Sequence, residues 1–220
     1  MGLSVDVRKF SNSIAFSSLY VIFSFIPVGT TMIGGQGSFS LSLIIPPVVG
    51  YLLGPIYGSF SMLIGALAYL FFNPTSFFGI LTPIVPMAGA LASGLNRKRL
   101  SYIVSFYLLL FAAFIISYYN EVWWFIIPHV VASASSLFHY LVNGKFRFLL
   151  NTFSSTFFQH ATGTLLAIFL FKLNAASLIM IFPLMLYERT VSTLGSFILL
   201  IALEKYFGKE FLLEQKMLYT

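Results

Sequence analysis

Long apolar runs follow one another from one end of this chain to the other, with only short polar or Gly/Pro joints between them. Eight runs can be distinguished, at residues 11–28, 41–53, 56–72, 79–95, 101–119, 125–142, 148–171 and 176–203. A helix needs about 20 largely apolar residues to cross a bilayer, and most of the runs approach or exceed that length. Charged residues make up only 8% of the chain, against about a quarter of an ordinary soluble domain. The pattern predicts an integral membrane protein.

The fold expected from this pattern is all-α, a polytopic membrane helix bundle of six to eight transmembrane or re-entrant segments. No stretch of the sequence is long or polar enough to form a separate water-soluble domain, so residues 1–220 are expected to form a single integral membrane domain. The N-terminal sequence MGLSVDVRKF lacks the apolar core and cleavage site of a signal peptide, so the first run is expected to stay as a spanning helix. The chain has no cysteine, which excludes disulfides and thiolate chemistry.

Two of the runs, 41–53 and 79–95, are short for a spanning helix. Prolines interrupt both of them: Pro46, Pro47, Pro83 and Pro86. Because proline removes a helical hydrogen bond and kinks or ends a helix, these runs are predicted to be tilted, broken or re-entrant. Broken helices at membrane depth are typical of an enclosed site. Kinked helices that serve only for packing are the alternative.

Suppose that eight segments cross the membrane and that both termini lie on the same side of it. The lysines and arginines are then unevenly divided between the two sides of the membrane. One side then receives Arg8, Lys9, Arg97, Lys98, Arg99, Lys145, Arg147, Lys205, Lys209 and Lys216. The other side receives Lys172, and Arg189 stays within the membrane. Because cytoplasmic loops carry the excess of basic residues, the split predicts a multi-pass protein of the cell membrane with both termini cytoplasmic. The basic residues form no patch with interleaved aromatics, so no nucleic-acid partner is expected.

Glycine recurs every four residues at Gly50, Gly54 and Gly58, and Pro55 follows the second of them. Small residues at this spacing let helices approach closely in lipid. Upstream lie an apolar first run and the polar loop GGQGSF. The order of features is therefore a first helix, an outer loop, a helix that ends in Leu-Leu-Gly-Pro, and a Gly-rich third helix.

Over residues 11–95, this order resembles the substrate-binding S components of energy-coupling factor (ECF) transporters. The residues that carry the resemblance are Leu52, Leu53, Gly54, Pro55, Tyr57, Gly58 and Gly65. The resemblance implies a membrane subunit that captures a vitamin or similar micronutrient from outside. It also implies an ECF-type transmembrane coupling protein and two cytoplasmic ATPases as partners. The eight runs here exceed the six helices usual in that family.

Small residues on the first helix contact the coupling protein in that family. Two pairs have the corresponding spacing here, Ser11 with Ala15 and Ser13 with Ser17. The same spacing serves helix packing within the chain equally well.

Polar side chains at membrane depth are hypotheses about function, because ionisable groups there are costly unless paired or hydrated. Glu188 and Arg189 lie within the last run, and His160 and Gln159 lie at a similar depth in the run before it. Adjacent helical residues do not face each other, so Glu188 and Arg189 are not expected to pair together. We expect the four side chains to converge on a polar substrate, with Arg189 suited to a carboxylate or phosphate. A buried structural network is the alternative.

Three further residues have weaker predicted roles. His129 follows Pro128 near the outer end of its run, where it is expected to line an entry or a closing loop. His139 is expected to pack or face the interface. Gln36 lies in the Gly-rich outer loop, which covers the substrate in S components, so it is the expected polar contact there; a flexible connector is the alternative.

The sequence indicates no enzyme and no cofactor, since it has no paired carboxylates at catalytic spacing, no H-E-x-x-H motif and no Walker A loop. Three single histidines on different runs are weak evidence for a metal, and no metal site is predicted. Two other functions stay open. One is a stand-alone proton-coupled transporter or channel, and the other is a membrane enzyme that modifies lipid.

Overall fold

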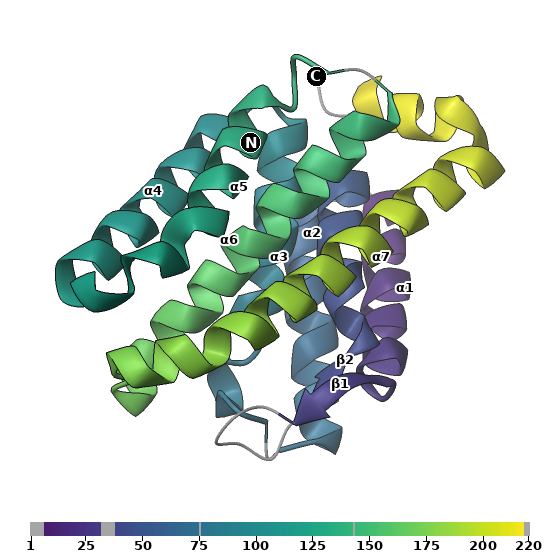
Figure 1. Cartoon of the computed structure of the whole chain (residues 1–220). Coiled ribbons are helices and arrows are strands. Elements are labelled where there is room, and N and C mark those ends of the chain that lie inside the picture. Colours follow the sequence, from purple (N-terminus) through teal and green to yellow (C-terminus); the bar gives the residue numbers. More distant parts are fainter. Residues whose placement is uncertain (1–6, 32–37, 75, 143, 218–220) are drawn as a thin grey trace, which may run out of the picture.

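A computed structural model describes residues 7–31, 38–74, 76–142 and 144–217. The helices in this part of the chain are α1 (Val7–Ser24), α2 (Ile45–Phe72), α3 (Ile84–Arg97), α4 (Ser101–Tyr118), α5 (Ile127–Phe138), α6 (Lys145–Phe171) and α7 (Ala175–Met217). Shorter elements join them: β1 (Pro27–Thr31), β2 (Ser38–Ser40) and the 3-10 turns η1 (Leu41–Ile44), η2 (Gly79–Leu81) and η3 (Asn120–Ile126). The helices pack side by side as a bundle (Figure 1). The predicted all-α membrane helix bundle is confirmed.

Helix α2 reverses direction at Gly54, which has φ 81° and ψ 178°. A β-carbon added to Gly58 would lie 2.8 Å from the α-carbon of Gly50, although eight residues of a straight helix span about 12 Å. The two arms of α2 are therefore folded against each other. The runs 41–53 and 56–72 are separate segments, as the sequence predicts, and the Gly54-Pro55 joint is the turn between them.

Contacts with α1 give the direction of each arm. The amide of Leu41 donates to the carbonyl of Ile26 just after α1 ends, at 2.8 Å. Ser17, in the middle of α1, donates to the carbonyl of Ser61 in the second arm at 2.7 Å. The ring of Phe72 then lies 6.2 Å from that of Phe25. The first arm thus runs away from the end of the bundle that carries β1 and β2, and the second arm returns to it. We call this end the hairpin end.

The opposite end, which we call the basic end, collects most of the described positive charge. Helix α3 ends there, because Gly94 lies against Gly54 and Pro55 at the reversal of α2. Helix α6 begins there, since the ring of Phe148 lies 5.3 Å from that of Tyr51. The basic residues at this end are Lys9, Arg97, Lys98, Arg99, Lys145, Arg147 and Lys205. Lys172 follows the other end of α6.

Arg97 stabilises the end of the first arm of α2. Its guanidinium donates to the carbonyls of Tyr51 and Leu52, the latter at 2.9 Å, and it lies over the ring of Tyr51. The last carbonyls of a helix have no partner within it, and a cation there also complements the helix dipole. The positive charge of Arg97, at the end of α3, therefore stabilises the C-terminal end of the first arm of α2.

Helix α6 lies at the centre of the bundle and packs against α3, α5 and α7 (Figure 1). Its buried face is polar for a membrane helix, and much of it is satisfied by neighbouring helices. Asn151 donates to Ser93 on α3 at 2.8 Å, and Asn96 of α3 donates to Ser154 at 2.8 Å. The exposed side chains of the bundle are largely apolar, as expected where lipid surrounds the protein.

Five stretches of the described chain are long and apolar enough to cross a membrane: Leu41–Phe72, Gly79–Arg97, Ser101–Tyr118, Asn120–Phe138 and Ala175–Tyr206. The first of them contains both arms of α2. The chain is thus a multi-pass membrane protein. The strands β1 and β2, which pair antiparallel between Pro27 and Ser40, were not predicted.

Replacing Gly54 with alanine is expected to lower the unfolding free energy by roughly 1–3 kcal/mol, because its backbone conformation is essentially restricted to glycine. Thermal unfolding of the purified protein in detergent measures the loss. Gly163→Ala is the matched control, since its added β-carbon would make only ordinary contacts, 3.7 Å from Val85. Equal stability of the two variants would contradict the reversal at Gly54.

Candidate functional site

Glu188 and Arg189 form an ion pair with each other on α7. Both side chains are buried, with 8% and 2% of their surface exposed. The prediction that they do not pair is wrong. The long, flexible arginine stem bends around the helix and brings the guanidinium to the neighbouring carboxylate, so the directions of the two Cα–Cβ bonds do not decide the contact. Arg189 Nη1 also donates to the carbonyl of Thr156 on α6, at 2.8 Å.

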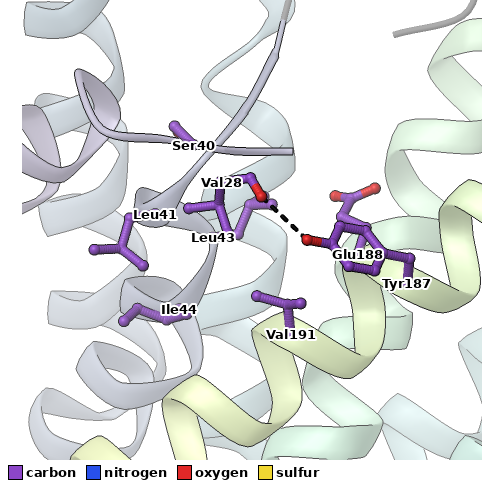
Figure 2. Close-up of a pocket in the computed structure, with 8 residues that line it drawn as sticks. All are labelled: Val28, Ser40, Leu41, Leu43, Ile44, Tyr187, Glu188 and Val191. Carbon is purple, nitrogen blue, oxygen red and sulfur yellow. Dashed lines mark hydrogen bonds between the residues drawn. The ribbon is translucent and has the colours of Figure 1, made fainter. Parts of the chain in front are cut away.

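Glu188 lies beside the β1–β2 hairpin (Figure 2). Glu188 lines a small cavity between α7, β1 and η1, and the hydroxyl of Tyr187 donates to the carbonyl of Val28 on β1 at 3.1 Å. One turn further along α7, Ser192 donates to the carbonyl of Leu43 at 2.8 Å. The cavity has a volume of about 10 Å³, which is room for about one water molecule. The hairpin and η1 therefore close over this part of α7.

Two buried polar atoms near the ion pair have no hydrogen-bond partner among the described residues. They are Nε of Arg189 and Oε1 of Gln159; the other buried atoms without a partner are Nδ1 of His129, Nε of Arg147 and Oδ1 of Asn151. Gln159 lies against Gly89 of α3, where a β-carbon would come within 2.7 Å of that oxygen. Thr156, whose carbonyl accepts from Arg189, precedes Gln159 by three residues, so both are neighbours on the same side of α6. Nε of Arg189 is thus a donor, and Oε1 of Gln159 an acceptor, without a partner among the described residues.

His160 belongs to a second group. Its Nδ1 lies 3.1 Å from Nε2 of His129, which is fully buried on α5. The rings of Phe111, Phe125 and Phe157 surround His129 at centroid distances of 4.7, 5.7 and 5.2 Å. No hydrogen bond between described residues joins either histidine to Glu188 or Arg189. The histidines therefore form a hydrogen-bonded pair in an aromatic box, beside the ion pair.

The structure thus pairs Glu188 with Arg189 and His160 with His129, and it places Gln159 against Gly89 of α3. His129 lies inside the bundle, although an entry position was predicted for it. His139 packs as expected, with its ring nitrogens against the carbonyls of Ser136 and Asn96 at 2.7 and 3.0 Å.

Gln36 lies outside the described residues. In the part of the chain that the structure describes, no group of three His, Asp or Glu side chains is placed to hold a metal ion.

The small residues of α1 face in two directions. Ser13 and Ser17 are buried against the second arm of α2, where Ser61 donates to the carbonyl of Ser13 at 2.8 Å. Ser11 and Ala15 are exposed. The first two therefore serve packing within the chain, and the other two lie on the outer face of α1.

Sequence reasoning missed two contributors to this site, Tyr187 and Thr156. Tyr187 precedes Glu188 in an apolar run and has no distinguishing spacing. Thr156 contributes a backbone carbonyl, and no side-chain pattern reveals a backbone acceptor.

Removing one member of the ion pair is expected to be costly. Glu188→Leu or Arg189→Met alone should lower the unfolding free energy by roughly 3–5 kcal/mol, because each leaves a buried charge unpaired. The double variant should recover most of this loss. Unfolding of the three variants in detergent measures the difference, and single variants as stable as the unchanged protein would refute the pair.

Comparison with known proteins gives a relative that is longer than this chain. No family model and no solved structure matches the chain. The uncharacterized protein MJ0923 of Methanocaldococcus jannaschii is 31% identical over 217 residues, which cover 90% of this chain and 72% of that protein. The chain therefore belongs to the same family of proteins as MJ0923.

Proposed function

We propose that the chain is the membrane-embedded binding subunit of an uptake system for a small polar nutrient, such as a vitamin. The observation that carries the proposal is the pair of unpartnered atoms beside the buried ion pair, Arg189 Nε and Gln159 Oε1. A buried donor or acceptor left without a partner costs about 1–3 kcal/mol. A ligand that supplies both partners recovers this cost.

These two atoms specify the chemistry of the ligand. Nε–H of Arg189 donates, so it suits a carboxylate, phosphate or carbonyl oxygen. Oε1 of Gln159 accepts, so it suits an N–H or O–H group on the same ligand. Glu188 keeps the guanidinium neutralised while the site is empty of ligand. The ligand is therefore a small molecule with an acidic or carbonyl group next to a donor.

For this function, the ligand would enter from the hairpin end. The cavity beside Glu188 holds about 10 Å³, far below the roughly 300–1,000 Å³ of small-molecule sites. Binding therefore requires the hairpin to move away from α7, which breaks the bond between Tyr187 and Val28. We assign the hairpin end to the outside of the cell membrane and the basic end, with both termini, to the cytoplasm, because basic residues favour the inner side.

The proposed partners are an ECF-type transmembrane coupling protein and cytoplasmic ATPases. The sequence has no Walker A loop, so ATP-driven uptake needs ATPases from outside this chain. Ser11 and Ala15 on the outer face of α1 leave room for a helix of the coupling protein to approach closely.

Affinity purification of the tagged protein from its native membranes tests the proposal. Mass spectrometry then identifies co-purified proteins and retained small molecules. A coupling protein with one or two ATPases is the expected result, and the retained molecule names the ligand. Recovery of the chain alone, under conditions that preserve other ATPase complexes, would overturn it.

Gln159→Leu is expected to weaken binding of the retained molecule roughly 3- to 10-fold, the worth of one hydrogen bond. Stability without ligand should not fall, because the variant removes an unpartnered buried acceptor. Isothermal titration in detergent measures the affinity. Ser117→Ala is the control, since that exposed hydroxyl bonds only to its own helix, at 2.8 Å from the carbonyl of Ala113. Unchanged affinity in Gln159→Leu would remove Gln159 from the site.

A proton-coupled transporter is a second candidate, favoured by the hydrogen bond of 3.1 Å between His129 and His160. Histidine pairs inside membranes relay protons in pumps and transporters. The two candidates differ in their energy source, because a relay needs no ATPase.

For the binding subunit, vesicles that contain this chain alone should not accumulate the ligand when a proton gradient is applied. Radiolabelled uptake measures this, with and without a protonophore. His160→Phe, which keeps an aromatic ring in the aromatic box, is the diagnostic variant. Gradient-driven uptake that is lost in this variant would favour the transporter.

A further inference from the structure

A groove of about 490 Å³ lies between α5, α6 and α7. Leu149, Phe153 and Phe157 of α6 form its floor. Pro128 of α5 lines one wall and Leu194 of α7 lines the other. The groove is separate from the cavity beside Glu188, with which it shares no lining residue.

Most residues that line the groove are apolar, and two of its three polar residues bond their hydroxyls within the protein. Ser135 turns its hydroxyl to the carbonyl of Val131 on its own helix, at 2.9 Å. Thr193 shares a hydrogen bond of 2.9 Å with Thr156. These hydroxyls therefore have partners within the protein and do not call for a polar ligand. The volume falls within the range of small-molecule sites, and the lining suits hydrocarbon.

The groove lies at membrane depth. Its walls belong to two of the stretches apolar enough to cross a membrane, Asn120–Phe138 and Ala175–Tyr206. Its floor extends from Leu149, four residues after the start of α6, to Phe157. At about 1.5 Å per residue, the floor is about 12 Å long and leads toward the basic end. A molecule bound in the groove therefore places its apolar part at mid-membrane depth and its polar part near the basic end.

Two exposed lysines lie beyond the groove, toward the basic end. Lys145 precedes Leu149 by four residues, so it lies on the same face of α6 as the floor. Lys205 follows Leu194 by eleven residues, so it lies on the same side of α7 as the wall, about 16 Å further along the helix. Glu204 precedes Lys205 but points about 100° away around the helix. The apolar groove thus leads toward positive charge.

We propose that the groove binds one anionic phospholipid, with an acyl chain against Phe153 and Phe157 and the headgroup at Lys145 and Lys205. The charge favours this occupant, because basic residues at the membrane surface attract anionic headgroups, and it also fits the predicted cytoplasmic position of the basic end. The site is independent of the proposed nutrient site, so either proposal can fail without the other.

Native mass spectrometry of the full chain in detergent tests the proposal, with phosphatidylglycerol and phosphatidylcholine of identical acyl chains as probes. Phosphatidylglycerol is expected to bind at least fivefold more tightly, and added salt should reduce the difference. The variant Lys145→Ala/Lys205→Ala should lose roughly fivefold in phosphatidylglycerol affinity per lysine. Lys172→Ala, at the hairpin end, is the control and should bind as the unchanged protein does. Equal binding of the two lipids, or an unaffected double variant, would overturn the assignment.

The position of the acyl chain is tested at Thr190, an exposed residue of the groove wall. Thr190→Trp should reduce binding of both lipids without lowering the unfolding temperature. Because the chain has no cysteine, Thr190→Cys also gives a unique thiol for crosslinking in native membranes. Crosslinking to lipid supports the proposal. Crosslinking to another membrane protein, or lipid binding unchanged in Thr190→Trp, would overturn it.

Discussion

Every polar group at membrane depth must find its partner inside the protein, and the arrangement of this bundle depends on that constraint. Helix α6 carries much of the buried polar surface and lies at the centre, where α3, α5 and α7 surround it. Asn151 and Ser154 bond to α3, and Thr156 bonds to α7. The polar face of this helix could not face lipid. The apolar helices therefore take the outer positions.

Much of the fold could be predicted because its determinants are local. The length of each apolar run and the positions of the prolines distinguish the runs from one another. The reversal of α2 falls at Gly54-Pro55, because only glycine readily adopts the positive-φ backbone conformation that it requires. The hairpin could not be predicted in this way. Its strands β1 and β2 are 5 and 3 residues long, too short for an alternation of apolar and polar residues to be visible. Their pairing depends on how α1 and η1 bring their ends together.

The candidate site was predictable in its residues but not in its contacts. Depth alone identified Glu188, Arg189, Gln159 and His160, since polar side chains are rare there. Which of them meet depends on the rotation of α6 and α7 and on side-chain length. Gln159 and His160 are adjacent and point about 100° apart, so one faces α3 and the other faces His129 on α5. The spacing of residues within one run does not predict which neighbouring helix each side chain faces.

The buried ion pair does not by itself argue for function, because a structural pair is neutralised in the same way. A functional pair is distinguished from a structural one by neighbouring polar atoms that have no hydrogen-bond partner. Selection for stability alone favours a partner for every donor and acceptor, and serine and asparagine supply several in the seam between α3 and α6, where Oδ1 of Asn151 is left without one. Nε of Arg189 on α7 and Oε1 of Gln159 on α6 also lack partners among the described residues. The ligand proposed above would supply partners for both atoms, and among the described residues the side-chain hydrogen bond that joins the hairpin to α7 is that of Tyr187 to the carbonyl of Val28.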